Sequence, residues 1–287
     1  MYKIISNPTA GKRGNKQALA LTKEVFDAAG VSYEVFETTC RGEAQDIVKK
    51  LTEGGEEIKL VIVGGDGTLH ETLNGIAEPE KCLLGIIPAG TGNDFAEAAK
   101  IPLDAKEAAR LILEGEAKPT DYLEMGGVRC MNVAGMGIDT EILQRCERGR
   151  MKGKLKYLIS LLQSVLSFKG WQIKFKQGEE TVELNTLVTA ACNGQQFGGG
   201  LKICPEAVID DGKIDVVVVE HIKGIFNLGK ALVTLLKGKI TTYPKTRHFL
   251  CEEIEVNAPP CTVQLDGELY SGLEFKVKVR KGLRIFR

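Results

Sequence analysis

The residues best suited to chemistry in this chain form the glycine-rich run Gly64-Gly65-Asp66-Gly67-Thr68, which lies between an apolar segment, residues 60–63, and an expected helix. Glycines lack a Cβ atom, so backbone N–H groups in such a run can approach phosphate oxygens, and the helix N-terminus adds positive partial charge. The run therefore predicts a phosphate-binding turn. The alternative is a plain strand-to-helix turn with Thr68 as the helix cap, because short glycine motifs also occur without phosphate.

Two further loops are expected at the same end of the sheet. Residues 6–12, which read Ser-Asn-Pro-Thr-Ala-Gly-Lys, follow the first expected strand, and residues 88–95, which read Pro-Ala-Gly-Thr-Gly-Asn-Asp-Phe, follow the fourth. Doubly wound α/β folds bind their ligands just beyond the carboxyl ends of the strands. None of the three loops has the spacing of a P-loop or of the G-x-G-x-x-G motif, which disfavours P-loop NTPases and dinucleotide dehydrogenases.

The first part of the chain, residues 1–119, alternates short apolar runs with longer segments of helical period. The expected strands are residues 3–5, 32–36, 59–63 and 83–87, and the expected helices are residues 15–29, 43–53 and 69–77. Gly30 lies where the first helix needs a residue that tolerates positive φ. This alternation is typical of an α/β domain with a doubly wound, mainly parallel sheet covered on both faces by helices.

The second part, residues 120–287, is expected to be a mainly β domain. Its expected strands are residues 185–192, 213–220 and 275–279, separated by turn residues such as Asp210-Asp211-Gly212. Two helical stretches, residues 154–168 and 225–236, interrupt the strands. The boundary rests on this change of pattern alone, and it leaves open that a terminal strand returns to the first domain.

Charge and cysteine usage narrow the class of protein. Lys+Arg and Asp+Glu each number 38, so the chain carries no net charge that would favour a nucleic-acid backbone. The eight cysteines are scattered singly, without a C-x-x-C pair or a histidine at zinc-ligand spacing, and neither His221 nor His248 is expected to bind a metal. The N-terminus lacks the apolar stretch of a signal peptide, so a cytoplasmic protein is expected, with peripheral contact at the inner membrane face as an addition.

With these motifs the sequence resembles, from end to end, the bacterial diacylglycerol kinase and related lipid kinase family. The resemblance rests on five runs: Asn7-Pro8-Thr9-Ala10-Gly11, residues 64–68 followed by Asn74-Gly75, residues 90–95, residues 205–212, and Leu265-Asp266-Gly267-Glu268. NAD kinases and phosphofructokinases share the G-G-D-G-T element, but the loop of residues 90–95 and the late D-G-E turn are similar to those of the lipid kinases. The implied fold is the one that NAD kinases and diacylglycerol kinases have in common.

The resemblance implies an enzyme that transfers the γ-phosphoryl group of ATP to a lipid hydroxyl, with diacylglycerol as the first-choice acceptor and phosphatidic acid as the product. A kinase of NAD or of a sphingoid base is the alternative among enzymes. A nucleotide-binding regulatory protein without turnover is the alternative from another class. The expected partners are ATP and a lipid substrate at the membrane surface, without nucleic acid, and a homodimer is left open.

The resemblance also implies a site in which ATP binds in the cleft between the two domains. The implied ATP contacts are Asn7, Pro8, Thr9, Ala10, Gly11, Thr38, Gly64, Gly65, Asp66, Gly67, Thr68, Leu69, His70 and Thr91. Relatives often carry Asn at the position of His70, whose imidazole could donate a hydrogen bond to phosphate or ribose or could belong to an exposed helix residue.

The implied general base is Asp266, which would take the proton from the attacking lipid hydroxyl. Without the resemblance, Asp266-Gly267 would be interpreted as an ordinary hairpin turn. Asp66 receives a supporting role with water and Mg²⁺ near the phosphates, although in sphingosine kinases the corresponding Asp is the usual candidate for the base. Asp94 is expected to do likewise or to face the substrate. Either of these two residues could instead cap the helix that follows it.

A structural Mg²⁺ site in the second domain is implied at Val208, Asp211 and Lys213, where only Asp211 would contribute a side chain. A plain turn is the alternative for this segment. A basic run precedes the apolar face of the helix expected over residues 154–168, and it consists of Arg145, Arg148, Arg150, Lys152, Lys154 and Lys156. A solvated loop is the favoured interpretation of this run, with a contact to anionic lipid as the alternative. Residues 225–236 are expected to pack in the core.

Overall fold

The computed structural model describes residues 1–8, 13–148, 164 and 167–287, and the chain divides into two compact units. Unit 1 comprises Met1–Tyr122 together with Arg280–Arg287, and unit 2 comprises Leu123–Val279. Among the described residues, no helix combines the length and the apolar character needed to cross a bilayer.

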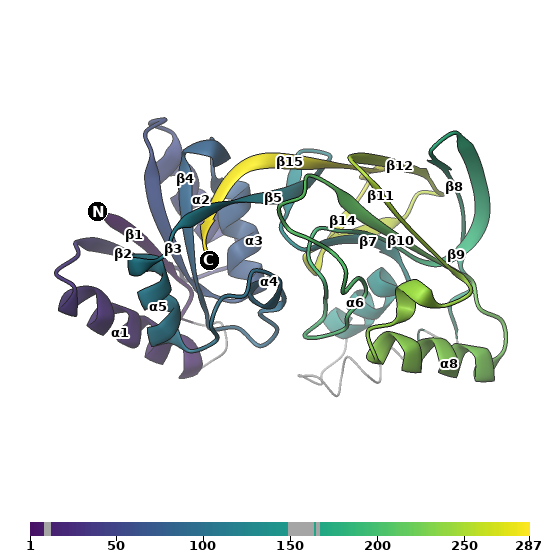
Figure 1. Cartoon of the computed structure of the whole chain (residues 1–287), viewed down its shortest axis with the longest axis horizontal. Coiled ribbons are helices and arrows are strands. Elements are labelled where there is room, and N and C mark those ends of the chain that lie inside the picture. The colour runs from purple at the N-terminus through teal and green to yellow at the C-terminus, as the bar shows by residue number, and fades with distance from the viewer. Residues whose placement is uncertain (9–12, 149–163, 165–166) are drawn as a thin grey trace. The chain divides into compact units, whose positions relative to one another are not determined.

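Unit 1 is built on a parallel sheet. Its strands are β1 (Tyr2–Ser6), β2 (Tyr33–Glu37), β3 (Ile58–Gly64) and β4 (Cys82–Pro88). Strand β1 pairs with β2 and with β3, and β3 pairs with β4, all in parallel. Strand β4 and residues 60–64 of β3 are continuous apolar runs buried on both faces, as is typical of parallel strands covered by helices. Figure 1 shows this sheet edge-on.

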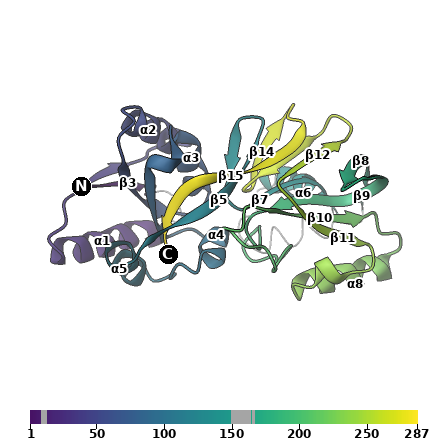
Figure 2. The same cartoon turned by 45° about the horizontal axis from the view of Figure 1, so that its top comes forward.

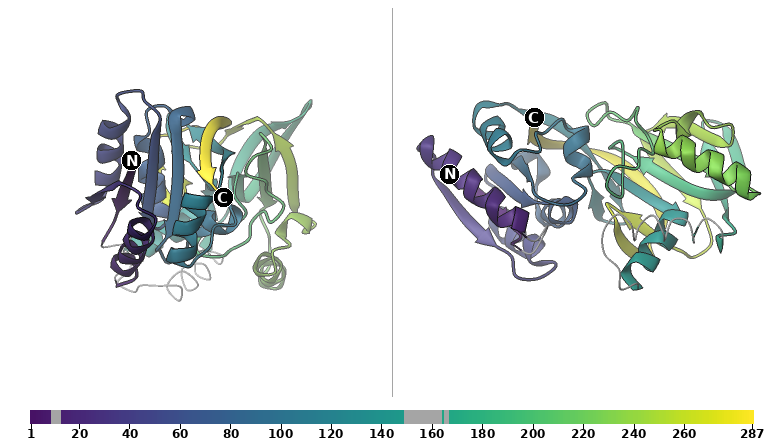
Figure 3. Two further views of the ribbon diagram at one scale, coloured as in Figure 1. Left: turned by 60° about the vertical axis from the view of Figure 1, so that its left-hand side comes forward. Right: turned by 90° about the horizontal axis from the view of Figure 1, so that it is seen from below.

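The helices of unit 1 pack as two pairs. They are α1 (Arg13–Ala28), α2 (Glu43–Thr52), α3 (Asp66–Gly75), the 3₁₀ helix η1 (Pro79–Lys81), α4 (Asp94–Ala98) and α5 (Ala105–Glu114). Helix α1 contacts α5 and α2 contacts α3, and Figure 3 shows helices on both sides of the sheet. The predicted doubly wound fold is therefore confirmed. Gly30 has the positive φ expected of it, 66°.

Two strands join the units along the chain. Strand β5 (Ala117–Met125) leaves unit 1, and β15 (Phe275–Phe286) returns to it and pairs in parallel with β4. The sequence placed the boundary between residues 119 and 120 and left the return of a terminal strand open. In the structure unit 1 extends to Tyr122 and takes in residues 280–287, because the end of β15 adds to the sheet beside β4.

Unit 2 is mainly antiparallel β structure, as predicted. Its strands are β6 (Val128–Cys130), β7 (Val133–Gly137), β8 (Trp171–Gln177), β9 (Glu180–Cys192), β10 (Ile214–Glu220), β11 (Thr246–Cys251), β12 (Glu253–Asn257), β13 (Thr262–Leu265) and β14 (Glu268–Ser271). Strand β9 is central, because it pairs with β7, β8 and β10. Strand β10 also pairs with β11.

Both faces of β10 are buried, each in a different apolar cluster. Val216 and Val218 belong to one cluster, and Val217 and Val219 belong to the other, as the two-residue period of a strand requires. The second cluster also contains residues of α6 (Ile138–Arg148), α8 (Ile225–Leu236) and the 3₁₀ helix η2 (Ile240–Thr242). Figure 2 shows α8 on one side of β10 and β11, with β12 and β14 on the other. The helix predicted over residues 154–168 lies almost entirely outside the described residues.

Candidate functional site

The carboxyl ends of β1, β3 and β4 lie at one edge of the sheet of unit 1, as the sequence predicted. The parallel register places Ser6 beside Val63 and Gly64 beside Pro88. Backbone hydrogen bonds continue past the strands, from Asn7 N to Val63 O (3.3 Å) and from Ala89 N to Gly64 O (2.8 Å). The loops that follow these strands therefore start from adjacent points. Residues 9–12 of the loop that follows β1 lie outside the described residues.

The glycine-rich turn of residues 64–68 and the loop of residues 88–95 touch through the backbones of two glycines. A Cβ atom on Gly65 would lie 2.8 Å from the Gly90 Cα, and a Cβ on Gly90 would lie 2.5 Å from the Gly65 Cα. Asn93 has a left-handed conformation (φ 54°) and stabilises the loop of residues 88–95. Its Oδ1 accepts a hydrogen bond from Gly90 N at 2.9 Å, and its Nδ2 donates one to Gly90 O at 3.1 Å. The glycines at 65 and 90 are thus required by close backbone approach.

Helix α3 begins earlier than predicted, at Asp66 instead of Leu69. Gly65 is its N-cap, and no side chain caps it, so the interpretation of Thr68 as the cap is wrong. The Thr68 side chain is buried, and a Cβ on Gly64 would lie 2.6 Å from its Oγ1. The first N–H groups of a helix have no partner within the helix and carry positive partial charge. An anion at this point would therefore be bound by backbone groups.

Asp66 links the glycine-rich turn of residues 64–68 to the loop of residues 88–95. Its Oδ1 accepts a hydrogen bond from Phe95 N, in the first turn of α4, at 3.4 Å. No side chain caps α3, so the alternative that Asp66 caps its own helix is wrong. Asp94, the first residue of α4, is buried.

His70 is only 4% exposed, so its interpretation as an exposed helix residue is wrong. The Asn74 Nδ2 donates to His70 O (2.9 Å) and lies 3.5 Å from His70 Nε2. Thr38 is also buried, and its backbone N–H donates to Ser6 O at 2.8 Å. These positions would serve a ligand mainly by shaping the backbone around it.

Thr91 is exposed and lines a pocket of about 380 Å³ within unit 1. The pocket lies between the loop of residues 88–93, the first turns of α1 and the start of α5. The sequence did not single out Asn15, a buried residue of α1 beside this loop system. Its Oδ1 accepts from Ser6 Oγ (3.1 Å) and its Nδ2 donates to Val63 O (3.0 Å), which ties the ends of β1 and β3 together.

Asp266 lies at the tip of the hairpin formed by β13 and β14 in unit 2. Asp266 and Gly267 both have positive φ, 53° and 86°, between the paired residues Leu265 and Glu268. This is the geometry of a two-residue D-G hairpin turn, so the local turn expected from the pair of residues is present.

The Asp266 carboxylate is also held by the segment before β7. It accepts from the backbone N–H groups of Met131 and Asn132, each at 2.8 Å, and from the Cys130 thiol at 3.1 Å. Burial, followed by the charge of Asp266, raises the pKa of Cys130 well above its usual value, which keeps the thiol protonated as a donor. Hydrogen bonds from N–H groups favour an ionised carboxylate in a fixed orientation.

Both parts of the chain match known families. Residues 1–125 match the diacylglycerol kinase catalytic domain, and residues 132–286 match the YegS C-terminal NAD kinase beta sandwich-like domain. A protein of Xanthomonas euvesicatoria pv. vesicatoria (strain 85-10) named "Probable lipid kinase YegS-like" is 32% identical over 290 residues, which cover 96% of this chain and 92% of the relative. The chain belongs to this lipid kinase family.

A second relative and a solved structure agree with this membership. The diacylglycerol kinase of Bacillus subtilis (strain 168) is 30% identical over 283 residues, covering 94% of this chain and 90% of the relative. A crystal structure of a diacylglycerol kinase from Bacillus anthracis str. Sterne, 24% identical, covers 99% of this chain and 96% of its own with a TM-score of 0.78, which shows the same fold. The resemblance seen in the sequence is confirmed, and the chain is a kinase.

In this lipid kinase the segment predicted to hold a structural Mg²⁺ forms a tight turn. Asp211 is exposed, its Oδ1 accepts from Lys213 N at 2.9 Å, and Gly212 between them has φ 73°. The Lys213 side chain pairs with Glu252 at 2.7 Å. The turn alternative is therefore present, and the metal site stays a prediction. Within the predicted basic run, Arg145 pairs with Glu141 on α6, and residues 149–156 lie outside the described residues.

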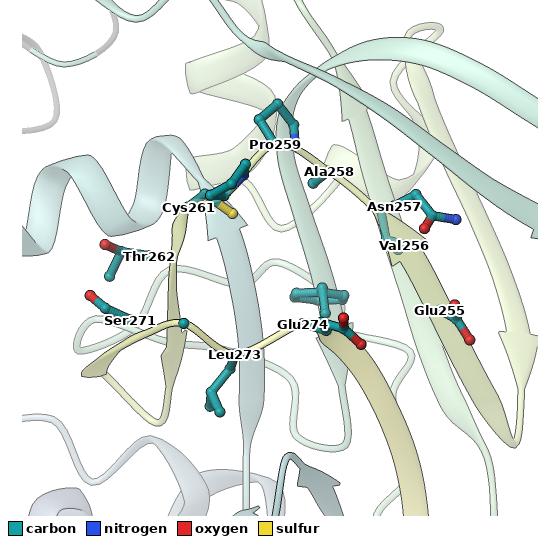
Figure 4. Close-up of a pocket in the computed structure, with 13 residues that line it drawn as sticks. Glu255, Val256, Asn257, Ala258, Pro259, Cys261, Thr262, Ser271, Leu273 and Glu274 are labelled. Atoms are coloured by element: carbon teal, nitrogen blue, oxygen red, sulfur yellow. The ribbon is translucent and has the colours of Figure 1, made fainter.

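Two hollows of unit 2 involve none of the predicted site residues. One, of about 630 Å³, lies between the connections of residues 257–262 and 271–275 and is shown in Figure 4. The other, of about 60 Å³, is almost wholly apolar and lies between α6, β9 and α8. Its one carboxylate belongs to Asp139, and burial raises the pKa of Asp139 to about 7. Asp139, the second residue of α6, was not singled out in the sequence, because no motif marks it.

Proposed function

We propose that this lipid kinase transfers the γ-phosphoryl group of ATP to the hydroxyl of diacylglycerol and produces phosphatidic acid. The observation that carries the proposal is the contact of two glycine loops beside the N-terminus of α3, which offers backbone N–H groups to a polyphosphate. Residues 7 and 8, Thr38, residues 64–70 and Thr91 are the proposed ATP contacts among the described residues.

Asp266 is the proposed general base in unit 2. Its hairpin and its backbone hydrogen bonds support this role, because they hold a charged carboxylate in one orientation. The proposal thus divides the work: unit 1 supplies nucleotide contacts, and unit 2 supplies the group that accepts the proton of the lipid hydroxyl.

Mg²⁺ is the proposed metal cofactor, and when bound it would offset the charge on the phosphate oxygens. Asp66 and Asp94, both at the start of helices beside the glycine loops, supply carboxylates of the kind that Mg²⁺ prefers. A second Mg²⁺ at Val208, Asp211 and Lys213 is proposed as structural, with Asp211 as its charged ligand.

The outer face of α8 is proposed to contact the membrane that carries the substrate. The predicted core packing of this helix is confirmed for one face only: Leu228 and Ala231 are buried, whereas Phe226 is 85% exposed. Val233 and Leu236 are also exposed. The same helix region presents exposed lysines, namely Lys223, Lys230, Lys237 and Lys239. Apolar side chains ringed by lysines bind anionic lipid surfaces.

The proposed reaction is tested by incubating the purified chain with γ-labelled ATP and Mg²⁺ and with diacylglycerol, a sphingoid base or NAD as acceptor. We expect label in phosphatidic acid. Label only in NADP, or in no lipid, would contradict the proposal.

The membrane contact is tested by co-sedimentation with anionic vesicles. We expect Phe226→Ser to weaken binding. Leu103→Ser is the matched control, because Leu103 is an equally apolar side chain of unit 1 that is 67% exposed. Equal binding of both variants and the unmodified chain would contradict a contact through α8.

A further inference from the structure

The faces of three adjacent strands bring metal-binding side chains together in unit 2. Asp215 on β10 lies opposite Cys192 on β9, and Val217 on β10 lies opposite His248 on β11. Residues two apart on a strand share a face, so Asp215 and His248 lie on the same face as Cys192. Cys204 reaches this face from the long connection between β9 and β10, where its N–H donates to Gln195 O at 3.1 Å.

The donor atoms converge. His248 Nε2 lies 2.6 Å from Asp215 Oδ1 and 3.7 Å from Cys204 Sγ, and all three donor atoms lie within 4.8 Å of one another. A hydrogen bond between Asp215 and His248 alone needs no thiol beside the same nitrogen. A Cys-His-Asp relay would use the two ring nitrogens for different partners, whereas here one nitrogen faces both. Three donor atoms of these types this close together suit a metal ion.

We propose that Cys204, Asp215 and His248 bind a zinc ion. A thiolate, an imidazole and a carboxylate form a mixed donor set that suits Zn²⁺, while Mg²⁺ and Ca²⁺ prefer oxygen alone. The site is therefore distinct in its chemistry from the Mg²⁺ proposed for the kinase reaction.

The Cys204–His248 distance agrees with a tetrahedral ion, whereas the His248–Asp215 distance would have to widen. Ordinary Zn–S and Zn–N bonds place the two ligand atoms about 3.6 Å apart, close to the 3.7 Å between Cys204 Sγ and His248 Nε2. The nitrogen and oxygen ligands of such an ion lie about 3.3 Å apart, so the 2.6 Å between His248 and Asp215 would widen as the ion replaces their hydrogen bond.

The surroundings leave a route of entry to the three donors. The Cys192 thiol and Glu206 Oε2, which lies 3.9 Å from Cys204 Sγ, are near Cys204 but outside the group of three donor atoms, so water would complete the four ligands. Cys204 and Asp215 are buried, and the His248 side chain is 25% exposed, which leaves one edge of the site open to solvent. An ion here would fasten the connection between β9 and β10 to the sheet.

The test uses the full chain after treatment with a chelator. The protein is incubated with Zn²⁺, separated from free metal by gel filtration and analysed for bound metal. We expect about one zinc ion per chain and a rise in melting temperature. Co²⁺ in place of Zn²⁺ should give the near-ultraviolet charge-transfer band of a cobalt–thiolate bond.

Single variants locate the site. Cys204→Ala and His248→Gln should each weaken zinc binding by at least about tenfold, since even outer-shell partners of a metal contribute that much. Cys40→Ala is the control, because Cys40 is an exposed thiol in unit 1 and should leave binding unchanged.

Absence of zinc uptake and of the cobalt band, or uptake that Cys204→Ala and His248→Gln leave unchanged, would overturn the proposal. If a variant fails to fold, the cobalt titration of the unmodified chain still decides, because a chain without a thiolate band has no such site.

Discussion

The glycine turn of unit 1 and the Asp266 turn of unit 2 place chemistry in opposite ways. In unit 1 the side chains of Thr68 and His70 are buried, and two glycines touch so that backbone groups are presented. In unit 2 backbone N–H groups instead hold a side chain, the Asp266 carboxylate, in place. The proposed phosphate site of unit 1 therefore depends on glycines that have no side chain. The proposed base of unit 2 depends on one side chain that is held in a fixed orientation. Different substitutions should break each.

The largest effect is expected from Asp266→Asn. Loss of the proposed general base should slow the reaction by about 10²–10⁴-fold, while ATP affinity should be unchanged because the proposed ATP contacts lie in unit 1. Rates of label transfer and ATP titrations measure the two quantities. Glu274→Gln, another acidic residue of unit 2, should retain activity. An Asp266→Asn enzyme of normal rate would remove Asp266 from the mechanism.

The pH dependence of the free energy of unfolding tests how much the buried Asp139 carboxyl costs in unit 2. Its pKa is raised from 3.8 to about 7 by burial, so between these values the folded chain holds a proton that the unfolded chain releases. The contribution of this proton to the free energy of unfolding is complete below about pH 4. It is lost as the pH rises towards 7, by about 1.4 kcal/mol per pH unit.

Asp139→Asn should remove this dependence. The variant should gain stability relative to the unmodified chain from about pH 4 to about pH 7 and hold a constant advantage above that, as measured by denaturant unfolding of unit 2. Glu183→Gln on the exposed side of β9 is the control and should show no such trend. Parallel curves for the Asp139→Asn and unmodified proteins would contradict a raised pKa.

Gly65→Ala tests the close backbone contact of unit 1. The added Cβ would force Gly90 away, which should cost about 1–3 kcal/mol and weaken ATP binding. Gly54→Ala is the matched control, because a Cβ at Gly54 meets nothing within 4 Å. Thermal unfolding and ATP titration give both readouts. Equal behaviour of the two variants would show that the contact is not needed.

The smallest effect is expected from Cys130→Ala. The thiol is a weak donor to Asp266, which two backbone N–H groups also hold, so its loss should cost about 1 kcal/mol and slow transfer a few-fold. A loss as large as that of Asp266→Asn would assign the thiol a direct role.

The sequence was most informative where function depends on backbone. Apolar runs and glycines located the loops at the sheet edge and the positive φ of Gly30, because these are local properties. The sequence was less informative where a side chain is hydrogen-bonded to a residue on a distant strand. The buried pair of Asn15 with Val63 and the meeting of Asp215 with His248 depend on packing and strand register that no local pattern encodes.

The start of α3 also differs from the expectation. Helix α3 begins at Asp66, three residues before the expected start at Leu69, with Gly65 as its N-cap. Thr68 has the residue type of a helix cap, but it lies inside the helix and is buried. His70 is buried as well, although its position two residues further along places it on a different side of the helix. Helix α3 is thus buried on more than one side, and burial of this kind depends on tertiary packing.

The division of work between the units is tested most directly by measuring ATP affinity and phosphoryl transfer on the same preparations of Asp266→Asn and Gly65→Ala. Asp266→Asn should bind ATP like the unmodified chain and transfer almost no label to diacylglycerol, whereas Gly65→Ala should lose transfer only in proportion to its weaker ATP binding. Loss of ATP affinity in both variants, or undiminished transfer by Asp266→Asn, would contradict this account.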